Sequence, residues 1–101
     1  MPKAYVLAEL TVPDAAAYAA SGYMGLAEAA VAAHGGRYLV RGGTVTSLEG
    51  GPDPAHIVIL EFPSRAAAEA FHISAEYTPA KNLRQKLSIA RFLVLDGYEP
   101  C

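Results

Sequence analysis

Two glycine pairs in the middle of the chain, Gly35-Gly36 and Gly42-Gly43, bracket a short run of residues that favour β structure. Between them lies the run Arg-Tyr-Leu-Val-Arg, residues 37–41, in which tyrosine and valine are strand-forming residues. A glycine pair commonly ends a helix, because glycine adopts the left-handed conformation of a C-cap. Glycines inside a strand usually mark a bulge or a bend. This stretch therefore predicts a helix before it, a strand within it and an irregular point after Arg41.

The residues before this stretch predict one strand followed by one helix. Both sides of the run at residues 4–12 are largely apolar, which is typical of a strand covered on both faces. Asp14 follows as a helix N-cap, because its carboxylate can accept hydrogen bonds from the first free amides. Apolar residues then recur at helical spacing, so we expect a helix over residues 15–33. Gly22 and Gly25 in its interior each cost about 1 kcal/mol relative to alanine.

The residues after this stretch predict a hairpin with a glycine- and proline-rich turn, a helix capped by Ser64, a short helix that starts at Thr78-Pro79, and a last strand. In the short helix we expect Lys81, Arg84 and Lys86 on a solvated face. The predicted ranges are strands at 37–48, 56–62 and 88–96, a turn at 49–54, a helix at 65–73 and a tail at 98–101.

The order of these elements is β-α-β-β-α-β, which predicts the ferredoxin-like α+β fold. In this fold one antiparallel four-stranded sheet carries the helices on one face, because both crossover connections are right-handed. We expect a single domain over residues 1–97. The opposite face of the sheet would carry apolar residues such as Leu7, Ile59 and Leu95, a patch that solvent would contact. We therefore expect a two-fold homodimer that pairs two sheets face to face.

Composition limits the partners of the chain. Of its 101 residues, 52% are hydrophobic and 18% are charged, and the formal net charge is −2. The small charged share favours burial against another chain, and the negative charge provides no bulk attraction to nucleic acid or to an anionic membrane. No apolar run reaches the ~20 residues of a membrane span. We therefore expect neither nucleic acid nor a membrane among the partners.

The single cysteine, Cys101, leaves no possible intramolecular disulfide and no cysteine–histidine spacing for a metal. The three histidines, His34, His56 and His72, also lack the spacing of metal ligands. We expect neither a metal nor a cofactor. The first residues show no signal-peptide pattern, so a cytoplasmic location is expected.

One charged residue lies among apolar neighbours on each predicted strand: Glu9, Arg41, Glu61 and Arg91. Because buried charges are rarely tolerated without a partner, we expect these side chains to meet. One interpretation is a salt-bridged cluster that sets strand register or dimer pairing. The other is a pocket in which arginine orients an anionic or carbonyl substrate while a carboxylate transfers a proton. Two carboxylates held close together would raise the pKa of one of them.

In the catalytic interpretation an arginine holds the substrate, a glutamate acts as the base and a tyrosine donates a hydrogen bond. Tyr18 and Tyr23 on the first helix could line a pocket as well, although such rings more often belong to a core. The candidate catalytic residues are Glu61 and Glu9, and the candidate substrate-binding residues are Arg41, Tyr5, Tyr18, Arg91 and His72.

Several parts of the chain together resemble a known family. The likeness covers nearly the whole chain, and the matching parts are Asp14 with Tyr18, the run from Gly35 to Gly43, Leu48-Glu49-Gly50, the run from Ile59 to Ser64, Ala70-Phe71 and Glu76-Tyr77. The family is called domain of unknown function 1330 and has no settled activity. The resemblance implies the dimeric α+β barrel superfamily, whose ferredoxin-like protomers pair through their sheets and which includes cofactor-free monooxygenases, muconolactone-isomerase-like enzymes and ligand-sensing domains. His72 departs from the family, which more often has tyrosine or tryptophan there.

Two functions follow as hypotheses. The first is a cofactor-free homodimeric barrel that binds a small organic acid or carbonyl compound between sheet and helices and transfers a proton, as an isomerase or a monooxygenase-type enzyme. The alternative is a non-enzymatic structural or sensing dimer whose charged cluster only maintains the fold. A nucleic-acid-binding version of the fold needs exposed aromatic residues beside a basic surface, which the net charge of −2 disfavours.

Overall fold

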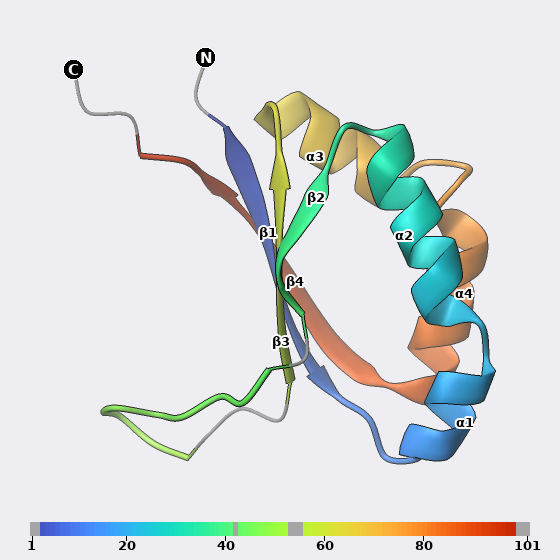
Figure 1. Cartoon of the computed structure of the whole chain (residues 1–101), viewed down its shortest axis with the longest axis vertical. Coiled ribbons are helices and arrows are strands. Elements are labelled where there is room, and N and C mark those ends of the chain that lie inside the picture. The colour runs from blue at the N-terminus through green and yellow to red at the C-terminus, as the bar shows by residue number, and fades with distance from the viewer. Residues whose placement is uncertain (1–2, 42, 53–55, 99–101) are drawn as a thin grey trace.

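The computed structural model describes residues 3–41, 43–52 and 56–98, and it shows one four-stranded sheet with helices packed against one face (Figure 1). Along the chain the elements are β1 (Ala4–Thr11), α1 (Ala15–Ala20), α2 (Tyr23–Ala33), β2 (Arg37–Arg41), β3 (His56–Phe62), α3 (Arg65–His72), α4 (Thr78–Leu87) and β4 (Ile89–Asp96). The strands lie in the order β2-β3-β1-β4, and all neighbours are antiparallel. This arrangement confirms the predicted ferredoxin-like α+β fold. Within the described part of the chain, no helix combines the length and apolar character that crossing a membrane requires.

The core lies between the helices and one face of the sheet. Along β1 the side chains alternate between the two faces of the sheet. Val6 and Leu10 are buried in the core, as is the alternate residue between them, whereas the other two residues between them are half-buried on the opposite face. Phe62, Phe71 and Tyr77 are almost fully buried, and the Phe71 ring centroid lies 5.2 Å from that of Phe62 and 4.4 Å from that of Tyr77. Burying each ring contributes on the order of 2 kcal/mol. Within one chain, therefore, β1 is covered on one face and not on both as predicted.

The predicted single helix over residues 15–33 is wrong, because the chain breaks between α1 and α2. Gly22 has a φ of 82°, the left-handed conformation that glycine adopts without steric cost. The Ser21 hydroxyl donates to the Tyr18 carbonyl at 2.7 Å and accepts from the Tyr23 amide at 3.1 Å. In a continuous helix, residues five positions apart would point roughly 140° away from each other. The break instead lets the rings of Tyr18 and Tyr23 lie together, with centroids 5.5 Å apart.

The second strand is shorter than predicted, and its irregularity lies elsewhere. β2 ends at Arg41 rather than at residue 48, and residues 43–48 form no strand. Gly42, where the sequence places a bulge, lies outside the described residues. The observed register shift occurs between Tyr38 and Val40, before the glycine pair, and leaves one extra residue on β2.

This bulge decides which face of the sheet Arg41 takes. Tyr38 pairs with Leu60 and Arg41 pairs with Val58, and both partners lie on the face that the helices cover. In a regular strand, residues three positions apart point to opposite faces. The extra residue therefore places Arg41 on the helix side of the sheet, together with Tyr38.

The other face of the sheet, which we call the bare face, carries no helix in the described part of the chain (Figure 1). Its apolar side chains are partly open to solvent, with relative exposures of 45% at Leu95 and 39% at Val40. The half-buried apolar residues of the same face are Leu7, Ile57, Ile59 and Leu93. The apolar patch that the sequence predicts is therefore present in the protomer.

Candidate functional site

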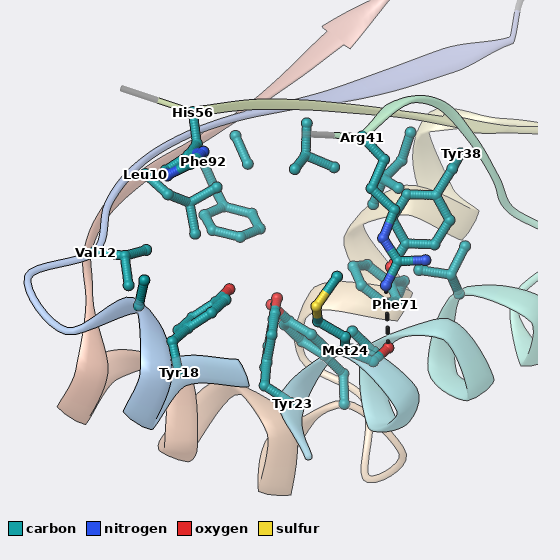
Figure 2. Close-up of a pocket in the computed structure, with 17 residues that line it drawn as sticks. Leu10, Val12, Tyr18, Tyr23, Met24, Tyr38, Arg41, His56, Phe71 and Phe92 are labelled. Carbon is teal, nitrogen blue, oxygen red and sulfur yellow. Dashed lines mark hydrogen bonds between the residues drawn. The ribbon is translucent and has the colours of Figure 1, made fainter. Parts of the chain in front are cut away.

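A cavity of about 270 Å³ lies between the helix side of the sheet and the helices α1 and α2 (Figure 2). Its wall is mostly apolar and contains several aromatic rings, and polar atoms enter from an arginine, a histidine and tyrosines. An apolar wall with a few convergent polar groups is typical of a small-molecule site. The lining residues are Ala8, Leu10, Val12, Ala15, Tyr18, Tyr23, Met24, Ala27, Val31, Tyr38, Arg41, His56, Val58, Leu60, Phe71, Tyr77 and Phe92.

Arg41 is the cation that lines this cavity, and its side chain reaches the cavity from the end of β2. Its Nη1 forms an ion pair with Glu28 on α2, and its guanidinium carbon lies 4.4 Å from the centre of the Tyr38 ring. Its Nη2 is 3.5 Å from the Met24 carbonyl, at the limit of a hydrogen bond. The side chains of Arg41 and Glu28 are 28% and 56% exposed. A pair this exposed adds little to stability.

Tyrosine hydroxyls and a buried arginine form a hydrogen-bonded chain on the helix side of the cavity. The Oη atoms of Tyr23 and Tyr77 are 2.8 Å apart, and Arg84 Nε donates to Tyr77 Oη at 3.3 Å. Figure 2 shows the hydroxyl ends of Tyr18 and Tyr23 directed into the cavity. Burial raises the pKa of Tyr18 and of Tyr23, so both side chains remain neutral at physiological pH. We call Tyr23, Tyr77 and Arg84 the Tyr–Tyr–Arg chain.

The predicted solvated position of Arg84 is wrong. Arg84 is only 5% exposed, and its guanidinium carbon lies 4.3 Å from the centre of the Phe92 ring. The reason is helical spacing: Tyr77 immediately precedes α4, and Arg84 follows it by seven residues, about two helical turns, so both lie on one side of the helix. This spacing is the sequence signal from which the pair could have been found.

The predicted cluster of four charges does not form, because the bulge in β2 puts Arg41 on the helix side while the other three lie on the bare face. Glu9 lies opposite Arg91 on β4. Glu61 lies opposite Tyr5, four residues along β1 from Glu9, which separates the two glutamates by roughly 13 Å along the strand. The two carboxylates are therefore not held close together.

Glu61 forms ion pairs with Lys3 and Arg37 instead of Arg41. Its carboxylate oxygens lie 2.9 Å from Lys3 Nζ and 3.1 Å from Arg37 Nη2. Hydrogen bonds from Lys3 and Arg37 lower the pKa of Glu61, whereas two neighbouring carboxylates would have raised it. Neither Glu61 nor Glu9 lines the cavity.

His72 is the last residue of α3, and its ring lies outside the cavity, beside Phe92 of β4. Its ring centroid is 5.9 Å from that of Tyr77 and 5.6 Å from that of Phe92. It lines a second cavity of about 280 Å³ at this edge of the sheet. Burial, followed by the charges of Lys81 and Arg84, lowers the pKa of His72, so the ring is neutral at pH 7.

Arg41 and Tyr18 are the predicted site residues that line the cavity, and the structure adds two that sequence reasoning does not select. Tyr38 belongs to the glycine-bracketed run, and its helix-side position depends on pairing with β3. His56 starts β3 two residues before Val58, so strand alternation alone could have placed it on the helix side. Among the described residues, no three histidine, cysteine or acidic side chains gather in a way that could hold a metal ion.

Solved structures with the same fold match almost the whole chain. RPA0582, a protein of unknown function from Rhodopseudomonas palustris, is 25% identical with a TM-score of 0.74, over 98% of this chain and 85% of that chain. SnoaB, a cofactor-independent oxygenase from Streptomyces nogalater, is 14% identical with a TM-score of 0.68, over 99% of this chain and 97% of that chain. A Caulobacter crescentus protein assigned provisionally as an antibiotic biosynthesis monooxygenase is 17% identical with a TM-score of 0.60, over 97% of this chain and 92% of that chain. None of the curated proteins matches this chain.

These likenesses agree on one architecture, the ferredoxin-like α+β fold. At such low identities the two oxygenase-related structures show the fold alone. The family itself follows from the sequence profile described as Domain of unknown function (DUF1330), which matches residues 3–98. The chain therefore belongs to the DUF1330 family, as the glycine-bracketed run and the Glu-Phe-Pro-Ser segment indicate.

Proposed function

We propose that this protein binds a small aromatic carbonyl or enol compound in the cavity, with an oxygen of the compound on Arg41. The observation that carries the proposal is the position of Arg41, whose charge enters an aromatic, mostly apolar cavity and whose counter-ion, Glu28, is itself exposed. Planar rings suit the tyrosine and phenylalanine walls, and a guanidinium suits an oxygen acceptor. Ligand pockets span roughly 300–1,000 Å³, so a cavity of about 270 Å³ suits a compound of one or two rings.

The chemistry that we propose is removal of a proton from a carbon next to the carbonyl group. The electron pair of that C–H bond moves to the carbonyl oxygen, and Arg41 stabilises the negative charge that develops there. His56 lines the cavity from the sheet side, as Arg41 does (Figure 2), and histidine is the side chain that exchanges protons near neutral pH. Because Glu61 and Glu9 lie on the bare face, we assign the base role to His56.

Two reactions can follow from the enolate. If the proton returns to a different carbon, the result is an isomerisation. If the enolate of a CH₂ group reacts with dioxygen, the carbon loses four electrons, O₂ gains them, and the products are a ketone and water. SnoaB, with the same fold, is a cofactor-independent oxygenase, which supports the second reaction.

A thermal-shift screen tests the binding proposal. Wild type, Arg41→Met and Arg91→Met are heated with aromatic ketones, aldehydes and naphthols, and Arg91→Met serves as the matched control because Arg91 lies on the bare face. At a hundredfold excess over its dissociation constant, a ligand stabilises the folded state by about 2.7 kcal/mol. We expect this gain in wild type and in Arg91→Met but not in Arg41→Met. Equal stabilisation of all three proteins, or none in wild type, would overturn the proposal.

Turnover is tested with each compound that binds. Exchange of its C–H protons in D₂O, followed by NMR, reports the proton transfer, and an oxygen electrode reports the oxygenase reaction. Both signals should fall by at least about a hundredfold in His56→Gln, since general base catalysis contributes 10²–10⁴-fold. Unchanged exchange in His56→Gln would remove the base role.

We also propose that two copies pair through the bare face. That face is apolar and carries Glu9 beside Arg91, so opposite charges can meet across a two-fold axis. Light scattering at micromolar concentration should give twice the protomer mass of 10.6 kDa for wild type. Leu95→Lys should give the protomer mass, whereas the control Leu26→Lys, on the outside of α2 and equally exposed at 43%, should keep the dimer. A wild-type mass of one protomer would refute the pairing.

The alternative of a purely structural charged cluster applies to Glu61. Its pairs with Lys3 and Arg37 connect the residue before β1 and the start of β2 to the end of β3. We propose that these contacts maintain the sheet and take no part in ligand binding.

A further inference from the structure

We propose that Tyr23 donates a hydrogen bond to the enolate or phenolate oxygen of the bound compound, and that Tyr77 and Arg84 are positioning residues that orient and strengthen this donor. The proposal rests on the proposed function, because it concerns the same cavity. It adds a neutral oxygen-binding group on the helix side of the cavity, whereas Arg41 approaches from the sheet side (Figure 2).

The direction of the Tyr–Tyr–Arg chain follows from the hydrogens available. A guanidinium can only donate, so Tyr77 Oη accepts from Arg84 Nε. Tyr77 is fully buried, and among the described residues its hydroxyl has no hydrogen-bond partner but Arg84 and Tyr23. If Tyr23 donated to Tyr77, the Tyr77 proton would have no acceptor among the described residues, which costs free energy. Tyr77 therefore donates to Tyr23, and the proton of Tyr23 is left for a group in the cavity.

Arg84 gives the Tyr–Tyr–Arg chain its positive charge. It is 5% exposed, and in the described part of the chain no carboxylate lies within ion-pair distance of it. Besides Tyr77, its guanidinium contacts the face of the Phe92 ring at 4.3 Å. A buried cation without a counter-ion strengthens each hydrogen bond that leads away from it. The negative charge of an ionised ligand on Tyr23 would complete the pairing that the described residues do not supply.

Tyr23 is placed for this role by the break between α1 and α2. It is the first residue of α2, directly after the left-handed Gly22, and Figure 2 shows its hydroxyl directed into the cavity. Burial and the Tyr77 hydroxyl raise the pKa of Tyr23 far above its ordinary value, so the side chain acts as a hydrogen-bond donor and not as a base.

The test uses 1-naphthol and naphthalene as probes, because they share one ring system and differ in the oxygen. Absorbance titration of bound 1-naphthol measures the preference of each protein for naphtholate over neutral naphthol. We expect this preference to fall ten- to hundredfold in Tyr23→Phe, since a hydrogen bond to a charged group is of that strength. Tyr77→Phe and Arg84→Gln should lower it in the same direction, because each removes a hydrogen bond that orients the Tyr23 hydroxyl. The matched control Tyr5→Phe, on the bare face, should keep it.

Naphthalene affinity reports whether the cavity is intact and should stay within threefold in all four variants. If wild type binds neither probe, the proposed function and this inference both fail. If Arg41→Met loses the naphtholate preference and Tyr23→Phe retains it, this inference is overturned and the proposed function stands. A loss of the naphtholate preference in Tyr23→Phe with no change in Tyr77→Phe would overturn the positioning role of Tyr77 and Arg84. If Arg84→Gln does not fold, Tyr77→Phe alone decides this point.

Discussion

Tyr38 and Arg41 point to the same side of the sheet, although they are three positions apart on β2. The register shift between Tyr38 and Val40 places one extra residue between them, and this brings the Arg41 guanidinium to 4.4 Å from the Tyr38 ring. In a regular strand Arg41 would share the bare face with Arg37. The cavity therefore owes its cation to an irregularity of the backbone.

Exchanging Val40 and Arg41 tests this relationship without changing the composition. Val40 lies opposite Ile59 on the bare face, so V40R/R41V moves the guanidinium out of the cavity. We expect the affinity for 1-naphtholate to fall about ten- to hundredfold, because one charge-assisted hydrogen bond is lost. Isothermal calorimetry measures the affinity, and circular dichroism checks the fold. Equal affinity of the exchanged variant and wild type would show that Arg41 does not hold the ligand.

Gly22 and Gly25 make a matched pair for the break between α1 and α2. A methyl group added at either position meets no atom within 4 Å, so backbone conformation decides the effect. Gly22 has a φ of 82°, where alanine costs about 1–2 kcal/mol. Gly25 lies inside α2, where alanine stabilises a helix by up to about 1 kcal/mol. Urea unfolding should give opposite signs for Gly22→Ala and Gly25→Ala, and a stabilised Gly22→Ala would contradict the break.

Glu61 predicts a loss of stability in acid. Its pKa in the folded protein is lowered below the ordinary 4.5 by Lys3 and Arg37, so the unfolded chain takes up the proton first as the pH falls. The stabilisation is fully present above pH 4.5 and is lost as the pH falls through the lower pKa of the folded state. Unfolding curves of wild type and Glu61→Gln between pH 3 and 7 measure it. Parallel pH profiles of the two proteins would contradict the ion pairs.

His72 predicts a separate pH dependence at higher pH. Burial lowers its pKa in the folded protein below the ordinary 6.5, so protonation favours the unfolded chain once the pH falls below that value. Stability should therefore decrease from pH 6.5 downward until the pH reaches the folded pKa. His72→Phe keeps an aromatic ring beside Tyr77 and Phe92 and should remove this dependence while leaving the acid dependence of Glu61 in place. Thermal unfolding at pH 5 and pH 8 compares the pH dependence of wild type with that of His72→Phe. The difference between the two proteins should persist when both also carry Glu61→Gln.

Local signals in the sequence predict much of the fold correctly. Asp14 and Ser64 cap their helices as expected, with side-chain oxygens that accept from the amides of Ala17 and Ala67 at 3.0 and 3.1 Å. Such caps involve residues three positions apart, so the chain specifies them without reference to the rest of the molecule. Strand alternation likewise places Leu7 of β1 on the bare face as expected, because side chains on a regular strand alternate.

The candidate site is predicted less well, because its parts come together across long sequence separations. Arg84 on α4 is three residues from Lys81 and two from Lys86, which gives the segment the composition of a solvated face. Its burial depends on Tyr77 and on Phe92 of β4, which pack over it. Composition of one helix cannot show which of its charges a neighbouring strand covers.

The sequence by itself determined the order of the strands and of the helical segments between them, the helix caps, the apolar bare face and membership of the DUF1330 family, because these depend on local periodicity and on residues near one another. Only the tertiary structure decided that Arg41 enters the cavity, since its face depends on a bulge that forms when β2 pairs with β3. It also joined Tyr23 to Tyr77, which lie 54 residues apart and meet because α2 packs beside α4. Strand register and helix packing arise from contacts between distant segments, and these contacts place the polar groups of the cavity.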